Sequence, residues 1–146
     1  MRILVLGAGV IGSVYAGKLL QAGHEVVLLA RGPRLADLQA HGLLLEDAES
    51  GNRTTQPAAV VSQPAPDDQF DLVLVPVRAE QLDGVLPVLA GMQNDSDVLF
   101  FGNAGNRGAK LAEALRGRAL FGFPAAGGIR DGPTIKYVLI RQQKTM

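Results

Sequence analysis

Apolar and polar positions along this chain predict strands and helices in alternation. Short apolar runs recur, and most are followed by a turn bearing glycine or proline and then by a stretch with helical spacing. Runs that are apolar at successive positions are typical of parallel strands buried on both faces, whereas a spacing of three and four predicts an amphipathic helix. The expected strands are residues 2–6, 25–30, 43–46, 53–56, 60–61, 71–77, 98–101, 119–123 and 134–140, and the expected helices are 13–21, 33–40, 80–89 and 110–115.

This order of elements predicts an α/β fold of the Rossmann type, with a doubly wound, mostly parallel sheet and helices on both faces. Residues 43–56 read as a small hairpin inserted into that pattern, and the last strand as an addition to it. The pair Gly127-Gly128 is interpreted as a turn. We expect residues 1–146 to form one domain. Four phenylalanines are expected in strands and core: Phe100, Phe101, Phe121 and Phe123.

The strongest local signal is the glycine-rich segment after the first strand. It has the pattern G-x-G-x-x-G between a predicted strand and a predicted helix, which is the context of a dinucleotide-binding fingerprint. The first glycine allows a sharp turn, the second allows backbone to approach a pyrophosphate, and the third allows close helix packing. Free N–H groups at the helix N-terminus attract phosphate. The sequence therefore predicts an NAD(P)-binding Rossmann domain with these cofactor contacts: Gly7, Ala8, Gly9, Val10, Ile11 and Gly12.

Arg31 directly follows the second strand, where the adenosine ribose of a dinucleotide is recognised. NAD-binding domains usually carry Asp or Glu there, because a carboxylate binds the ribose 2′-hydroxyl. A carboxylate also repels a 2′-phosphate, which a guanidinium attracts. No carboxylate precedes Asp37 in this segment. We therefore expect NADP(H) as the cofactor with Arg31 as a contact; the alternative is an exposed loop arginine without this role.

Composition narrows the remaining classes. The 14 Lys and Arg residues balance 14 Asp and Glu residues, which predicts no nucleic-acid and no membrane partner. Cys is absent, and His24 and His41 have no acidic cluster beside them, so we expect no metal site. With no signal-peptide pattern and no apolar run of membrane length, we expect a cytoplasmic protein that binds a small molecule. The sequence leaves open whether the protein forms a homodimer.

Several segments together resemble the amino-terminal half of the ketopantoate reductase family. They occur in the same order and spacing and cover nearly the whole chain: RILVLGAGVIGSVYAGKLLQAGHEVVLLAR, GLLLED with its turn, DLVLVPVRAEQ, FGNAGN and GFPAAGGIRDG. The resemblance implies an NADPH-dependent reduction of a 2-oxoacid to a 2-hydroxyacid, as in pantothenate biosynthesis. It also implies roles for particular residues of this chain.

The family usually has a lysine near the nicotinamide ribose and the substrate, at the position where this chain has Arg78. Gln81 matches the family pattern and is expected at the cofactor. Asn103 matches the asparagine of a family Asn-Gly pair at the nicotinamide end, with Ala104 in place of the glycine. The resemblance therefore implies that Arg78 and Asn103 are the catalytic candidates, and that they position cofactor and substrate.

The residues alone leave other readings open. Arg78 could instead form an ion pair with Glu80 or Asp71, and Asn103 could form a turn or cap the following helix. A regulatory nucleotide-binding module without chemistry shares the fold and the fingerprint. Another dehydrogenase, such as a 3-hydroxyacid type, shares the first half.

The resemblance further implies a carboxyl-terminal helical domain that supplies a catalytic lysine, substrate-binding asparagines and a carboxylate. No segment of these 146 residues matches that domain, so we interpret the chain as an isolated cofactor domain. Reduction of a carbonyl needs an aligned substrate and a proton source besides the hydride donor. We therefore expect this chain by itself to be inactive as a reductase.

Overall fold

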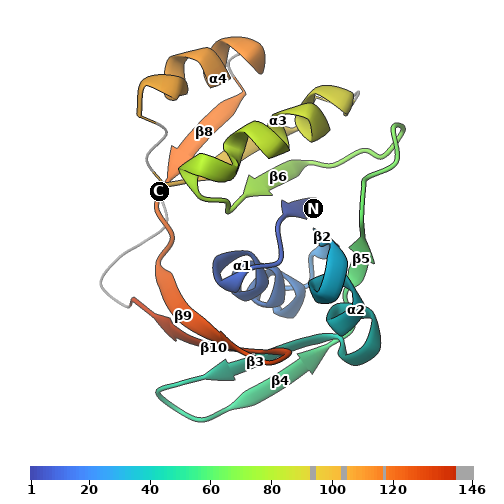
Figure 1. The fold of residues 1–146 in the computed structure, drawn as a ribbon, viewed down its shortest axis with the longest axis vertical. Coiled ribbons are helices and arrows are strands. Elements are labelled where there is room, and N and C mark those ends of the chain that lie inside the picture. Colours follow the sequence, from blue (N-terminus) through green and yellow to red (C-terminus); the bar gives the residue numbers. More distant parts are fainter. Residues whose placement is uncertain (93–94, 103–104, 117, 141–146) are drawn as a thin grey trace.

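A computed structural model describes residues 1–92, 95–102, 105–116 and 118–140, and in it a helix lies between two β-sheets (Figure 1). The larger sheet has six parallel strands in the order β5-β2-β1-β6-β7-β8. This arrangement confirms the expected Rossmann-type α/β fold. The strands of this sheet are β1 (Arg2–Leu6), β2 (Glu25–Leu29), β5 (Ala59–Val61), β6 (Leu72–Val75), β7 (Asp97–Phe101) and β8 (Ala119–Gly122).

Helices cover both faces of the large sheet. On one face lie α1 (Val10–Gln21) and α2 (Gly32–His41), and on the other α3 (Leu82–Gly91) and α4 (Gly108–Ala114). Single 3₁₀ turns, η1 (Ala79–Gln81) and η2 (Gly105–Arg107), precede α3 and α4. Alternate residues of β1 enter two different apolar clusters, Ile3 and Val5 on the α1 side and Leu4 and Leu6 on the α3 side. Burial on both faces explains why the strand sequences are apolar at successive positions.

The second sheet was not predicted from the sequence. It has the order β4-β3-β10-β9, with β10 parallel to β3 and antiparallel to β9. The expected hairpin and the expected last strand therefore belong to one sheet, which packs on α1 from the side opposite the large sheet. Its strands are β3 (Leu43–Asp47), β4 (Arg53–Gln56), β9 (Ala126–Asp131) and β10 (Thr134–Leu139).

The interpretation of Gly127-Gly128 as a turn is wrong, because both residues lie inside β9. Gly128 is paired with Tyr137 of β10, and a Cβ on Gly128 would collide with the carbonyl oxygen of Lys136. The missing side chain here permits close approach of two backbones within a sheet.

Of two smaller expectations, one is confirmed and the other is partly wrong. Pairing of β6 ends at Val75, just before Pro76, as a proline without an N–H requires. Phe100 and Phe101 are buried, but core burial is wrong for Phe121 and Phe123, which are 39% and 55% exposed. Phe121 lies on β8, which is the edge strand of the large sheet, and Phe123 lies beyond the end of β8. Among the described residues, no helix has the length and apolar character needed to cross a membrane.

Candidate functional site

The carboxyl ends of the parallel strands lie at one edge of the large sheet, and the order of the strands reverses beside β1. From β1 the chain continues to β2 on one side, whereas β6 pairs with β1 on the other side. Ligands of doubly wound sheets bind outside such a switch point. Two pockets open at this edge and share Val77. The β2-side pocket, of about 280 Å³, is lined by Leu6, Gly7, Leu29, Arg31, Val77, Gln81, Gly84, Val85 and Val88. The β7-side pocket, of about 370 Å³, is lined by Ile11, Pro76, Val77, Arg78, Ala79, Leu82, Phe100, Phe101, Gly102 and Pro124.

The glycine-rich segment forms the turn between β1 and α1. Gly7 has a φ of 128°, a left-handed conformation that favours glycine. A Cβ on Gly12 would collide with the carbonyl oxygen of Gly7, so the first turn of α1 lies directly against the loop. A Cβ on Gly9 would meet no atom within 4 Å. Backbone is therefore accessible at Gly9, and a ligand can approach it closely.

The N-terminus of α1 makes this loop attractive to an anion. Val10 begins the helix, Ile11 lines the β7-side pocket, and no acidic residue lies in the first turn. The first N–H groups of a helix lack partners within the helix and carry partial positive charge. The loop therefore presents hydrogen-bond donors and favourable electrostatics to a phosphate.

Arg31 and Gln81 both line the β2-side pocket, together with Gly7. Arg31 is exposed, its backbone is extended, and α2 begins at the next residue. The Gln81 Oε1 accepts a hydrogen bond from the Arg78 N–H at 3.1 Å, which fixes the start of η1. The structure thus brings Gly7, Arg31 and Gln81 to one cavity.

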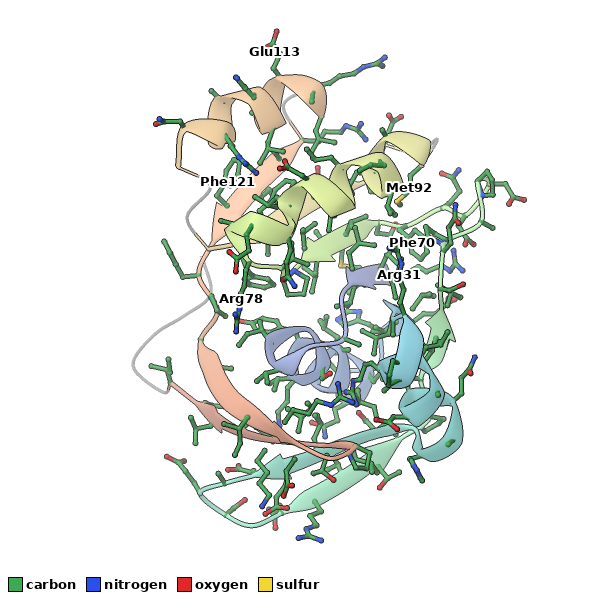
Figure 2. All side chains as sticks on the ribbon, in the orientation of Figure 1. Arg31, Phe70, Arg78, Met92, Glu113 and Phe121 are labelled. Carbon is green, nitrogen blue, oxygen red and sulfur yellow. The ribbon has the colours of Figure 1, made fainter. Side chains whose placement is uncertain are left out.

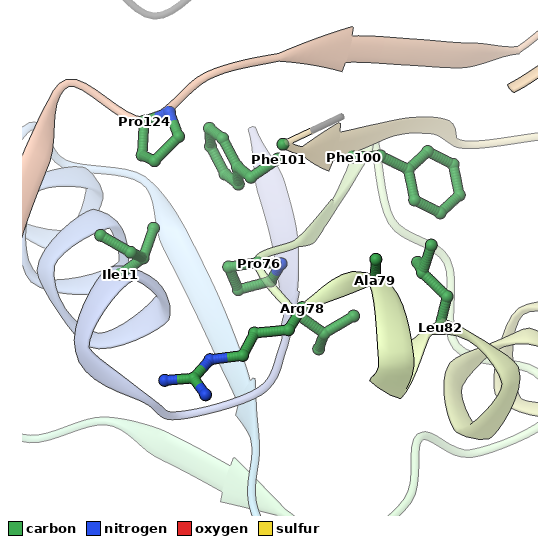
Figure 3. Close-up of a pocket in the computed structure, with 10 residues that line it drawn as sticks. Ile11, Pro76, Arg78, Ala79, Leu82, Phe100, Phe101 and Pro124 are labelled. Carbon is green, nitrogen blue, oxygen red and sulfur yellow. The ribbon is translucent and has the colours of Figure 1, made fainter. Parts of the chain in front are cut away.

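Arg78 lines the β7-side pocket, and its side chain extends away from Ala79 and Leu82 towards the α1 side (Figure 3). In the part of the chain that the structure describes, no acidic residue forms an ion pair with Arg78. The carboxylate of Asp71 accepts a hydrogen bond from the Arg2 N–H instead. In the view of Figure 2 both Arg31 and Arg78 lie between α1 and α3. Two exposed cations therefore border the same strand edge.

The expectation for Asn103 falls outside the described residues, as does Ala104. The neighbouring Gly102 lines the β7-side pocket, has a φ of 103°, and donates its N–H to the Gly122 carbonyl oxygen at 2.7 Å. The chain therefore turns sharply at the carboxyl end of β7, next to the pocket. Across the described ranges, no group of three or more His, Asp or Glu residues is arranged to hold a metal ion.

Sequence reasoning missed Arg34 in the first turn of α2. Its side chain is only 8% exposed and donates to the Ala8 carbonyl oxygen behind the glycine-rich loop. Burial lowers the pKa of Arg34 from its usual value, and repulsion by Arg130 adds to this, while Asp37 opposes it. A signal did exist: Arg34 precedes the buried Leu38 by four residues and so shares its helical face.

Known proteins resemble this chain in sequence over nearly its whole length. Residues 3–145 match the family described as Ketopantoate reductase PanE/ApbA. The chain is 27% identical over 135 residues to the 2-dehydropantoate 2-reductase of Pyrococcus horikoshii, an alignment that covers 92% of this chain and 43% of that protein. The chain therefore spans less than half the length of this relative.

Solved structures share the fold. The crystal structure of 2-dehydropantoate 2-reductase from Methylococcus capsulatus has a TM-score of 0.80 at 23% identity, covering 94% of this chain and 45% of that one. The ternary structure of D-mandelate dehydrogenase with NADH and anilino(oxo)acetate has a TM-score of 0.78 at 23% identity, covering 93% and 45%.

Proposed function

The chain belongs to the ketopantoate reductase PanE/ApbA family, and from this premise we propose that it is the NADP(H)-binding domain of an enzyme that reduces a 2-oxoacid to a 2-hydroxyacid. One observation carries the proposal. Arg31 and Gly7 line the same pocket, which supports the assignment of Arg31 to the 2′-position of the adenosine ribose in a dinucleotide site. The relatives named above support the reaction class, and the site supports the cofactor.

The residues of the two pockets suit the two ends of such a cofactor. The β2-side pocket offers the apolar side chains of Leu29, Val85 and Val88 to an adenine ring, with Arg31 beside them for a 2′-phosphate. The pyrophosphate then lies over the Gly9 backbone and the N-terminus of α1. The space beside Gly9 is open, because a Cβ on this residue would meet no atom within 4 Å. Gln81, fixed by its bond to the Arg78 N–H, borders the adenosine ribose.

The nicotinamide end falls in the β7-side pocket. A bound nicotinamide supplies the hydride, whereas the protein orients the carbonyl and excludes water. Most of the lining is apolar, with Ile11, Phe101 and Pro124 among the residues that shield it (Figure 3). Arg78 is the cation in this lining, and its planar fork suits the carboxylate of a 2-oxoacid or a ribose hydroxyl. We assign Asn103 a neighbouring role, after the strand that ends at Phe101.

NAD(H) is the main competing cofactor, because the D-mandelate dehydrogenase structure contains NADH. The residue after β2 decides between them. A carboxylate there would bind the 2′-hydroxyl of NAD, whereas this chain has Arg31 and no acidic residue lining the β2-side pocket among the described residues. A regulatory module without chemistry is disfavoured by the second pocket, which places Arg78 next to an apolar cavity beyond the phosphate loop.

Titration of NADPH and NADH into this chain and its Arg31→Ala variant tests the proposal. We expect NADPH to bind more tightly than NADH to the parent chain. The contact of a guanidinium with a 2′-phosphate is worth about 1.5–3 kcal/mol, or roughly 10- to 100-fold in affinity. Arg31→Ala should lose most of that preference and leave NADH binding almost unchanged.

A matched control is Arg53→Ala, since Arg53 is an exposed arginine on β4 of the second sheet, paired with Glu46 at 3.0 Å. This variant should keep the parent preference for NADPH. Equal affinities of the parent chain for NADPH and NADH would contradict the proposed cofactor, and failure to bind either would contradict the proposed domain.

A further inference from the structure

Arg34 is the one charged residue that is buried in the described part of the chain. Its guanidinium reaches three acceptors. Nε donates to the Ala8 carbonyl oxygen at 2.8 Å, Nη2 to the Ser13 Oγ at 2.9 Å, and Nη1 to the Pro133 carbonyl oxygen at 3.3 Å. Ser13 donates its hydroxyl to the same Ala8 oxygen at 3.1 Å. We call these four residues the Arg34 network.

All partners of Arg34 in this network are neutral. The nearby carboxylate of Asp37 pairs with Arg130 at 2.9 Å. Arg34 thus carries a positive charge that no described carboxylate neutralises by direct contact. Arginine stays protonated in proteins even when burial lowers its pKa. A buried charge without a counter-ion is costly, and an anion bound close by would offset that cost.

The network also orients the glycine-rich loop. In a planar trans peptide, the carbonyl and the N–H point in opposite directions. Two donors hold the Ala8 carbonyl towards Arg34 and Ser13, so the N–H of Gly9 in the same peptide unit points away from them. Among the described residues this N–H has no backbone acceptor, and the space beside Gly9 is open. The loop is therefore held with a free donor directed outward.

We propose that Arg34 is a positioning residue for the dinucleotide pyrophosphate: it holds the Ala8–Gly9 peptide with its N–H directed at the phosphate and adds positive charge from behind the loop. This rests on the proposed function, because it assumes that a dinucleotide binds over the loop. Arg34 contacts protein groups only and does not touch the cofactor. Its role differs from that of the exposed Arg31, which is assigned to the 2′-phosphate.

Three ligands separate these roles. ADP-ribose has the pyrophosphate and lacks the 2′-phosphate, 2′-AMP has only the 2′-phosphate, and NADPH has both. Arg34→Met removes the charge and the fork at similar length. We expect it to weaken the binding of ADP-ribose and of NADPH by about tenfold, the order expected when one positive charge near a partly buried anion is lost. Binding of 2′-AMP should stay within about twofold. Arg31→Ala should give the opposite pattern, with 2′-AMP weakened and ADP-ribose unchanged.

Arg34→Lys keeps the charge but lacks the fork that reaches Ala8 and Ser13 together. We expect it to recover part of the ADP-ribose affinity, and it decides the question if Arg34→Met does not fold. Calorimetric titration reports the stoichiometry, which gives the competent fraction of each variant. A merely structural role would reduce that fraction and leave the affinity per competent molecule unchanged for all three ligands.

The outcomes are distinct. Unchanged ADP-ribose affinity in Arg34→Met, or in Arg34→Lys where only that variant folds, overturns the inference while the parent still binds NADPH. A loss of 2′-AMP binding in the same variant also overturns it, because Arg34 would then belong to the 2′-phosphate site. If the parent chain binds neither NADPH nor ADP-ribose, the proposed function fails and the inference fails with it.

Discussion

At the scale of single residues, the glycine-rich loop lacks a side chain at three positions, and the reason differs from one position to the next. Gly7 adopts a left-handed φ, and Gly12 brings the first turn of α1 against the Gly7 carbonyl oxygen. Gly9 leaves open space over the loop. These three requirements differ, since one is conformational, one is a close contact within the protein, and one is access for a ligand. A substitution therefore has a different consequence at each position.

Gly12→Ala should destabilise the fold. The new methyl group would collide with a backbone carbonyl, which cannot move aside by changing rotamer. Overpacking of this kind costs about 1–3 kcal/mol, even though alanine is intrinsically better than glycine in a helix by about 1 kcal/mol. Unfolding in urea measures the change. Gly91→Ala is the matched control, because a Cβ on that last residue of α3 meets no atom within 4 Å. Equal stability of the Gly12→Ala variant and the parent would contradict the assigned contact.

The residues whose place at the strand edge could be predicted from the sequence are those whose position follows from local order. The glycines between a strand and a helix, and Arg31 after the second strand, needed no knowledge of distant segments. Arg34 was different, because its acceptors are Ala8, Ser13 and Pro133, which lie 26, 21 and 99 residues away. Nothing near Arg34 in the sequence shows that these atoms surround it.

At the scale of elements, α1 is the centre of the molecule because it packs on both sheets. A Cβ on Gly17 would collide with Leu45 of β3, so the helix and the second sheet lie very close together. The six parallel strands could be predicted from apolar runs alternating with helices. The second sheet could not, because β10 pairs with β3 across a gap of 90 residues and local patterning does not encode that pairing.

Ile135→Ala tests whether the second sheet shares the core with α1. Ile135 of β10 is fully buried in the cluster that includes Val14 and Ala16 of α1. Truncating a buried isoleucine costs about 2–5 kcal/mol through lost burial and the cavity left behind. Ile129→Ala on the neighbouring strand β9 is the control, since Ile129 is 64% exposed and should change stability by less than about 0.5 kcal/mol.

Unfolding of both variants and the parent chain in guanidinium chloride gives the free energies of unfolding to be compared. If Ile135→Ala changed the free energy of unfolding no more than Ile129→Ala does, the second sheet would not be part of the cooperative core. The packing of α1 between two sheets would then contribute little to stability.

At the scale of the whole molecule, the strand edge combines the glycine-rich loop, two exposed arginines and two open pockets. The larger pocket has one wall from α1, one from the β6–α3 connection and one from the segment around Phe101 and Pro124. The described residues leave this pocket partly open to solvent. Such a cavity can hold a planar ring against protein, but water reaches that ring and a second reactant has few contacts to orient it.

This arrangement predicts that the 146-residue chain binds NADPH but does not turn over a 2-oxoacid. Reduction of a carbonyl requires a proton for the product hydroxyl. The described residues that line the β7-side pocket include no His, Asp, Glu, Lys, Tyr or Cys, which are the side chains that usually serve as general acids. Turnover is measured as the loss of NADPH absorbance in the presence of ketopantoate. A binding titration of NADPH on the same sample shows whether the cofactor site is occupied, so that inactivity is not caused by an empty site. Turnover at about 1 s⁻¹ or faster, a rate ordinary for enzymes, would show instead that these residues complete the reaction without a further proton donor.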